Sequence, residues 1–217
     1  MTVRVDPLVA LYMVRVKICG MTNLDDALQA ASCGADALGF NFYPESPRYV
    51  APEKARAIVS ALPPFVTVVG LFVNAPASEV EEISRDCGVH VLQLHGDEGP
   101  EFCGQFSRPV IRAIQVRDGS FLEDVARYSV QGFVLDAYHP ALYGGTGRVF
   151  DWELVRDAGR YGKIILAGGL TPENVAEAIR KGKPYAVDVA SGVERSPGVK
   201  DPDKVKQFVL NAKRACW

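Results

Sequence analysis

The sequence predicts one (β/α)₈ barrel, in which each of eight parallel strands is followed by a helix, over residues 13–217. Eight short apolar runs alternate with helix-like segments along the 217-residue chain, as repeated strand–helix units do. The runs are apolar at nearly every position, which is typical of parallel strands covered by helices. The units recur about every 25 residues, a spacing that suits short connections.

A repeated glycine signal supports this fold class. The segments C-G-A-D-A-L-G-F, C-G-V-H-V-L-Q-L and G-K-P-Y-A-V-D-V each place a glycine at the end of a helix. In each, a strand starts within about three residues of that glycine. The structural alternative is an open, doubly wound sheet. Such a sheet normally carries G-x-G-x-x-G after its first strand, and C-G-M-T-N-L does not match that pattern.

The first strand is expected over residues 14–19, where apolar residues alternate with Arg15 and Lys17. A helix follows at once, with Thr22 or Asn23 as its N-cap. The other strands are expected in the apolar runs 35–42, 66–73, 90–96, 110–115, 132–136, 163–167 and 185–190. Prolines and helical spacing predict the remaining helices from Pro52 to 62, from Pro76 to 87, at 101–106, 121–128 and 152–158, from Thr171 onward, and from Asp201 to 214.

Composition narrows the class of protein. With 48% hydrophobic residues and a formal net charge of −2, the chain fits one soluble domain whose main partner is neither nucleic acid nor a membrane. Residues 1–12 precede the core pattern, and we interpret them as an extension outside the barrel. Five cysteines without C-x-x-C spacing and three histidines without ligand spacing predict a reduced, cytoplasmic, metal-free protein. Monomer and homodimer are both compatible with the sequence.

In a barrel, the carboxyl ends of all strands open onto the face that carries the active site. Polar residues are concentrated at these carboxyl ends, whereas the starts of the strands carry few polar residues that could form a site. Those at the carboxyl ends are Cys19, Asn41, Tyr43, Arg48, Gln93, His95, Arg112, Gln115, Asp136, Asp188 and Ser191. This asymmetry predicts one site on that face.

Two glycine-containing turns predict phosphate binding. Gly168-Gly169 follows the seventh strand and Ser191-Gly192 follows the eighth, and the loops after these strands are the usual phosphate site of the fold. Glycines let backbone N–H groups approach an anion closely. The alternative is that these glycines only make turns.

A thiol and a carboxyl from opposite sides of the barrel mouth could exchange protons with a ligand between them. Cys19 would act as base and Asp136 as acid in an enolisation. Arg48, in a loop between two tyrosines, could clamp a carboxylate. Simpler readings remain for each: a buried apolar thiol, a carboxyl that fixes the following loop, and a solvated arginine. His95 and Asp188 could be site residues or satisfied buried polar groups.

The ordered set of motifs resembles one family. The motifs are V-R-V-K-I-C-G at 14–20, G-F-N-F-Y at 39–43 with Arg48-Tyr49, Q-L-H-G at 93–96, L-D at 135–136, Y-G-G-T-G at 143–147, F-D-W at 150–152, A-G-G-L at 167–170 and D-V-A-S-G-V-E at 188–194. From residue 13 to the carboxyl terminus the chain closely resembles the phosphoribosylanthranilate isomerases of tryptophan biosynthesis.

This resemblance implies a (β/α)₈ barrel that converts N-(5-phosphoribosyl)anthranilate to 1-(2-carboxyphenylamino)-1-deoxyribulose 5-phosphate by an Amadori rearrangement, without metal or cofactor. It implies that Cys19 is the general base and Asp136 the general acid. Arg48 would bind the anthranilate carboxylate, and Gly168, Gly169, Ser191 and Gly192 the phosphate. Gln93, His95 and Asp188 are further candidate substrate-binding residues. We also expect the site to lower the pKa of Cys19, since a free thiol is mostly protonated at neutral pH.

Two rival functions remain. A sister isomerase of histidine biosynthesis performs the same rearrangement on a bis-phosphate, but it has an aspartate where Cys19 stands and a second phosphate site. The third strand here ends F-V-N-A-P, without a glycine pair. The other rival is an inactive phosphate-binding barrel, and the presence of both Cys19 and Asp136 argues against it. The glycine-rich loop 137–149 could close as a lid.

Overall fold

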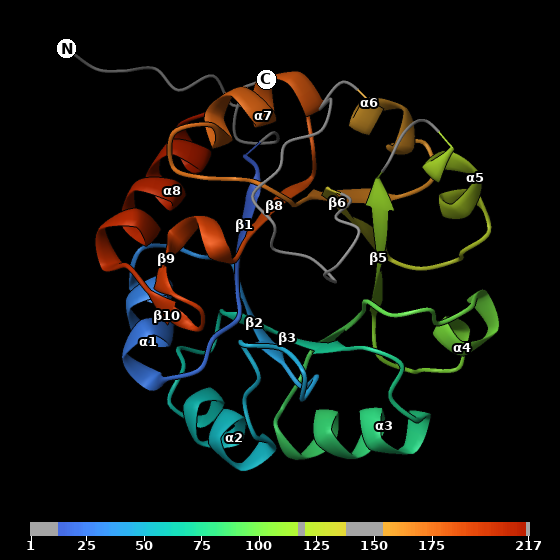
Figure 1. The fold of residues 1–217 in the computed structure, drawn as a ribbon, viewed down its shortest axis with the longest axis horizontal. Coiled ribbons are helices and arrows are strands. Elements are labelled where there is room, and N and C mark those ends of the chain that lie inside the picture. The colour runs from blue at the N-terminus through green and yellow to red at the C-terminus, as the bar shows by residue number, and fades with distance from the viewer. Residues whose placement is uncertain (1–12, 117–119, 138–153, 216–217) are drawn as a thin grey trace.

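The computed structural model describes residues 13–116, 120–137 and 154–215. Eight parallel strands close into a barrel in sequence order, β8 pairing with β1 (Figure 1). The strands are β1 (Arg15–Cys19), β2 (Ala37–Asn41), β3 (Thr67–Phe72), β4 (Val91–Leu94), β5 (Val110–Val116), β6 (Gly132–Ala137), β7 (Lys163–Leu166) and β8 (Ala186–Val189). The predicted fold class is therefore confirmed. The predicted extension 1–12 and most of the loop 137–149 lie outside the described residues.

The helices form a ring around the strands (Figure 1). They are α1 (Leu24–Ser32), α2 (Pro52–Ser60), α3 (Ala77–Asp86), α4 (Pro100–Gly104), α5 (Phe121–Ala126), α6 (Leu154–Ala158), α7 (Val175–Gly182) and α8 (Pro202–Arg214). Asn23 is the N-cap of α1, and its side chain accepts a hydrogen bond from the Asp26 amide at 2.9 Å. In the described part of the chain, no helix is long and apolar enough to span a membrane.

A short 3₁₀ turn and a two-stranded hairpin after β8 were not predicted. A 3₁₀ turn, η2 (Ser191–Val193), leads into a hairpin of β9 (Glu194–Ser196) and β10 (Val199–Lys200). This hairpin lies outside the barrel, beside α1 in Figure 1. The Thr22 hydroxyl donates to the Gly198 carbonyl, and the Lys200 amide donates to the Asp26 carboxylate at 2.7 Å. The hairpin is thus attached to the loop that follows β1 and to the first turn of α1.

The predicted start of α7 was wrong. The helix begins at Val175, not at Thr171-Pro172. The Asn174 side chain instead accepts from the Thr171 amide at 2.8 Å and donates to the Gly169 carbonyl at 2.8 Å. These two bonds stabilise a turn where the sequence suggested a first helical turn, and they fix the loop that contains Gly168-Gly169.

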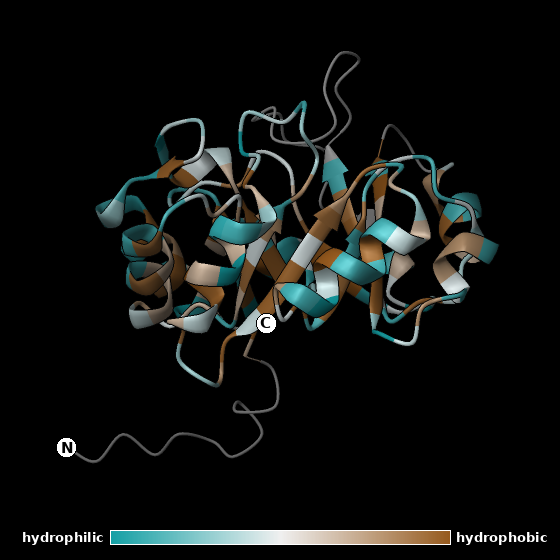
Figure 2. Cartoon of the chain, turned by 90° about the horizontal axis from the view of Figure 1, so that it is seen from below, coloured by the Kyte–Doolittle hydropathy of each residue, from teal (hydrophilic) through white to brown (hydrophobic). Residues whose placement is uncertain are grey.

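Most apolar residues fill the space between the strands and the helices, and Figure 2 shows the hydrophobic colour concentrated on the strands. A smaller cluster lies apart from this main core, on β5 to β8 and just after β7: Ala113, Val134, Ile165, Ala167 and Ala186. On β1, Val16 and Ile18 belong to the main core, whereas Lys17 and Cys19 take the opposite face. Lys17 is only 4% exposed, so the charged face of this strand is buried near the barrel mouth.

Candidate active site

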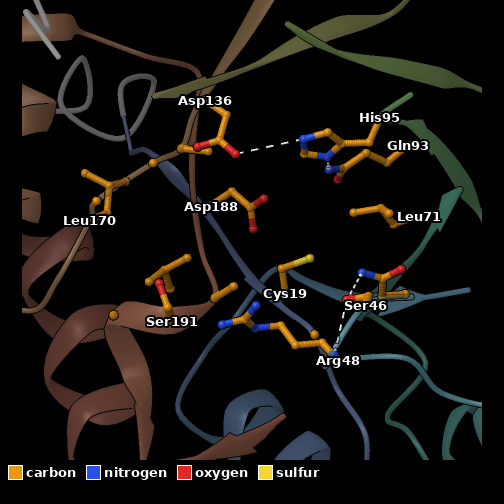
Figure 3. Close-up of a pocket in the computed structure, with 18 residues that line it drawn as sticks. Cys19, Ser46, Arg48, Leu71, Gln93, His95, Asp136, Leu170, Asp188 and Ser191 are labelled. Atoms are coloured by element: carbon orange, nitrogen blue, oxygen red, sulfur yellow. Dashed lines mark hydrogen bonds and ion pairs between the residues drawn. The ribbon is translucent and has the colours of Figure 1, made fainter. Parts of the chain in front are cut away.

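One pocket at the carboxyl ends of the strands contains every residue that the sequence predicted for substrate or catalysis (Figure 3). Its empty space, open mouth included, is about 630 Å³. The ten predicted residues that line it are Cys19, Arg48, Gln93, His95, Asp136, Gly168, Gly169, Asp188, Ser191 and Gly192. Asn41 lines it as well.

Arg112, another polar residue from the strand ends, has a structural role outside the pocket. Arg112 does not line the pocket; its guanidinium lies 3.2 Å from the Glu98 carboxylate and donates to the carbonyls of Leu94 and Gly96. Glu98 in turn accepts from the amides of Asn74 and Gly96, both at 2.8 Å. This buried cluster connects the loops after β3 and β4.

The floor of the pocket is formed by β1, β2 and β8. Register pairs Lys17 with Asp188 and Cys19 with Gly39. The Lys17 ammonium lies 2.8 Å from Asp188 Oδ2, and both side chains are over 90% buried. A Cβ atom built on Gly39 would lie 2.7 Å from Cys19 Sγ and 3.1 Å from Lys17 Cε. The missing side chain at position 39 is therefore what lets the thiol and the lysine stem rest side by side.

Burial and charge act in opposite directions on the Cys19 thiol. Burial raises the pKa of Cys19, and the neighbouring Lys17 ammonium lowers it by less, so the pKa is raised overall. Burial also lowers the pKa of Lys17, but Asp188 and Cys19 together outweigh it and raise that pKa. Lys17 is therefore a charged ammonium. The expectation that the site lowers the thiol pKa is wrong, because the sequence did not reveal how deeply the sulfur is buried.

Asp136 lies on the opposite side of the pocket from the thiol, next to His95 (Figure 3). His95 Nε2 is 3.9 Å from Asp136 Oδ2, and His95 Nδ1 is 3.1 Å from Gln93 Nε2. Burial, together with the charges of Lys17 and Arg112, lowers the pKa of His95 to about 3. The ring is therefore neutral at pH 7. With the Gln93 amide donating to Nδ1, its single proton is on Nε2 and faces Asp136.

Several buried polar atoms at the pocket have no hydrogen-bond partner among the described residues. They are Gln93 Oε1, His95 Nε2 and Asp188 Oδ1. Buried polar groups in folded proteins are normally satisfied by protein, water or ligand. These atoms belong to residues that line one cavity, so they are available to the polar groups of a ligand or to water.

The glycine turns after β7 and β8 form one side of the pocket. Gly168 and Gly169 have φ values of +80° and +66°, a conformation that other residues rarely adopt. A Cβ atom on Gly192 would lie 1.9 Å from the Leu170 carbonyl oxygen. The two turns therefore touch through their backbones, and only glycine allows this approach.

Arg48 closes the pocket next to Cys19 and Ser191 (Figure 3). Its guanidinium donates from Nε and Nη2 to the Glu194 carboxylate at 2.9 and 2.7 Å. The sequence predicted Arg48 but gave no partner for it. Lys17, Glu194 and Lys200 were all missed; for Lys17, its position two residues before Cys19 on one strand was an available signal.

Comparisons with known proteins agree on one family. The family model described as N-(5'-phosphoribosyl)anthranilate (PRA) isomerase matches residues 16–211. A relative of that name from Trichlorobacter lovleyi is 55% identical over 204 residues, covering 94% of this chain and all of the relative.

Solved structures agree as well. The phosphoribosyl anthranilate isomerase of Thermotoga maritima superposes with a TM-score of 0.87 at 45% identity, covering 93% of this chain and 99% of that one. An isomerase solved in complex with reduced 1-(o-carboxyphenylamino)-1-deoxyribulose 5-phosphate gives a TM-score of 0.83 at 42% identity, with the same coverage.

Proposed function

We propose that Cys19 and Asp136 carry the proton transfers of the N-(5'-phosphoribosyl)anthranilate isomerase family, to which this chain belongs. The reaction is the Amadori rearrangement of N-(5'-phosphoribosyl)anthranilate in tryptophan biosynthesis. One observation supports the two roles above all others. The thiol and the carboxyl come from β1 and β6 and line the same small pocket.

In the first step, Asp136 protonates the ribose ring oxygen as the ring opens to a Schiff base. His95 supports this role because its neutral ring directs a donor toward the carboxyl group without adding a positive charge. An added positive charge would favour the ionised carboxylate and leave less of the protonated form that donates the proton.

In the second step, the Cys19 thiolate removes the proton from C2, and the resulting enolamine tautomerises to the ketone. The raised pKa of the thiol makes the thiolate a stronger base once it forms. The cationic Schiff base in the same pocket would lower that pKa again, since an adjacent positive charge favours the thiolate. The base would therefore be generated when the substrate is ready to lose its proton.

Binding uses the rest of the pocket. We assign the phosphate to the backbone of Gly168, Gly169, Ser191 and Gly192, where the two turns make contact. The anthranilate carboxylate is assigned to Arg48. Gln93 and Asp188 have buried oxygens without a protein partner among the described residues, and these are suitable acceptors for ribose hydroxyl groups.

The loop after β3 disfavours the bis-phosphate isomerisation of histidine biosynthesis. There Asn74 binds Asp97 and Glu98 through its side chain and backbone, leaving no counterpart of the glycine turns that follow β7 and β8. We further propose a cytoplasmic location, because the four described cysteines are free thiols.

A coupled assay tests the activity. Phosphoribosylanthranilate is generated in place and its conversion is followed with the purified chain, and the bis-phosphate substrate is tested in parallel. We expect turnover of the first substrate and none of the second. Turnover of the bis-phosphate alone would support the sister reaction, and turnover of neither would support the inactive barrel.

A further inference from the structure

A buried ion cluster lies behind Arg48, outside the residues assigned above to substrate binding or proton transfer. Lys200 is fully buried and Glu194 is 8% exposed. The Lys200 ammonium lies 2.9 Å from Glu194 Oε1, and the same carboxylate accepts two hydrogen bonds from the Arg48 guanidinium. The three side chains form a chain in which one carboxylate joins two cations.

Lys200 also connects the backbone at the edge of the pocket. Its ammonium donates to the carbonyl of Cys19 and, at 3.3 Å, to that of Ala190. These carbonyls lie at the end of β1 and just after β8, so all three ammonium protons have acceptors. Lys200 therefore ties the base-bearing strand to the loop that contains Ser191-Gly192.

The β9–β10 hairpin delivers this lysine. The Gly198 amide donates to Glu194 Oε1 at 3.3 Å, and the backbone of Lys200 is attached to Asp26 as described above. The Thr22–Gly198 bond fixes the turn of the hairpin. The hairpin thus has a rigid geometry, and its two ends supply Glu194 and Lys200 to the cluster.

The cluster determines which edge of Arg48 faces the ligand. Glu194 occupies Nε and one side of Nη2, and no described residue accepts a hydrogen bond from Nη1. A guanidinium binds carboxylates best with two parallel N–H groups. The edge formed by Nη1 and Nη2 therefore remains for an anion.

We propose that Glu194 and Lys200 are positioning residues that hold Arg48 with its free edge toward the anthranilate carboxylate. This proposal rests on the assignment of Arg48 to that carboxylate. A purely structural cluster would contribute to folding without distinguishing ligands that have a carboxylate from ligands that lack one.

The test uses Glu194→Gln and Lys200→Met in the full chain. Glutamine keeps the size of Glu194 but places an N–H₂ group against the two cations, so Arg48 loses its support. The probes are reduced 1-(o-carboxyphenylamino)-1-deoxyribulose 5-phosphate and the same compound without its carboxyl group, titrated by calorimetry. We expect Glu194→Gln to raise Kd for the first probe and KM for the substrate about tenfold, with kcat within about twofold and Kd for the second probe unchanged. Lys200→Met also removes the donor to the Cys19 and Ala190 carbonyls, so it should weaken both probes, and the first more than the second.

Lys213→Met is the matched control. Lys213 also joins a backbone carbonyl, that of Val14 just before β1, to a carboxylate, that of Asp36, but at the opposite end of the barrel. Its loss should lower stability and leave both Kd values unchanged.

Arg48→Ala distinguishes the role of Arg48 in binding the carboxylate from the positioning role of Glu194 and Lys200. If Arg48→Ala weakens the carboxylated probe and Glu194→Gln does not, the positioning role is wrong and the assignment of Arg48 stands. If Arg48→Ala has no effect, the assignment itself fails. Equal weakening of both probes in Glu194→Gln would also overturn the proposal. If Lys200→Met does not fold, Glu194→Gln alone decides.

Discussion

Replacing Lys17 by methionine tests how far the charge of Lys17 lowers the pKa of the buried Cys19 thiol. Methionine fills nearly the same volume but removes the cation that lies 2.8 Å from Asp188 and beside Cys19. We expect the pKa of Cys19 to rise further. Lys17 is the largest of the influences that lower it, and it outweighs the opposing charge of Asp188.

The same change should destabilise the fold. Lys17 and Asp188 have side chains 5% and 8% exposed, so the pair is buried. Removing one partner of a buried ion pair typically costs 3–5 kcal/mol, because the remaining charge loses its compensation. We expect a loss of about 3 kcal/mol in the free energy of unfolding. Replacing both partners, as in Lys17→Met with Asp188→Leu, should recover most of it.

Thiolate absorbance and the alkylation rate, each followed against pH, report the pKa. The Cys19→Ser variant supplies the background from the other thiols, and urea unfolding gives the stability. An unchanged or lower thiol pKa in Lys17→Met would refute the electrostatic reasoning. A stable Lys17→Met variant would show that Asp188 has another compensating partner.

Three further outcomes follow from the site. Because the pKa of His95 is about 3 in the fold and about 6.5 when unfolded, the unfolded chain takes up the extra proton, so stability is lost as pH falls from 6.5 toward 3. This single group should cost about 2 kcal/mol at pH 5, and His95→Gln should remove that part of the slope in urea unfolding. Gly192→Ala, whose new methyl group would meet the Leu170 carbonyl, should weaken competitive inhibition by inorganic phosphate; unchanged inhibition would contradict the phosphate assignment. Arg48→Ala should raise KM about 10- to 100-fold, and an unchanged KM in steady-state assays would reject its carboxylate role.

Much of this site could be predicted from the sequence, because in a barrel the position of a residue relative to its strand determines the face on which it lies. A residue just after an apolar run must lie at the carboxyl end of a strand, and all such ends share one face. Cys19 and Asp136 could therefore be brought together from strands far apart in the chain. The glycine turns after β7 and β8 followed from the same rule.

Pairings that depend on side-chain reach were not accessible. The contact between Lys17 and Asp188 crosses the closure between β1 and β8, 171 positions apart. Alternation suggested a polar face for Lys17 but did not show that this face was buried. Lys200 was missed because the short β9–β10 hairpin places it in the interior. Strands of two or three residues are too short to give a periodic pattern from which the hairpin could be predicted. The predicted direction of the Cys19 pKa shift was wrong for a related reason. How deeply the sulfur is buried depends on the packing of the whole barrel, which the sequence does not show.

The most direct test of the account measures turnover and ligand affinity together in Cys19→Ala and Asp136→Asn. We expect each variant to lose about a thousandfold in kcat, as the loss of a general base or acid does, while Kd for reduced 1-(o-carboxyphenylamino)-1-deoxyribulose 5-phosphate stays near the wild-type value. Near-normal turnover in either variant would contradict the assignment of the two proton-transfer groups.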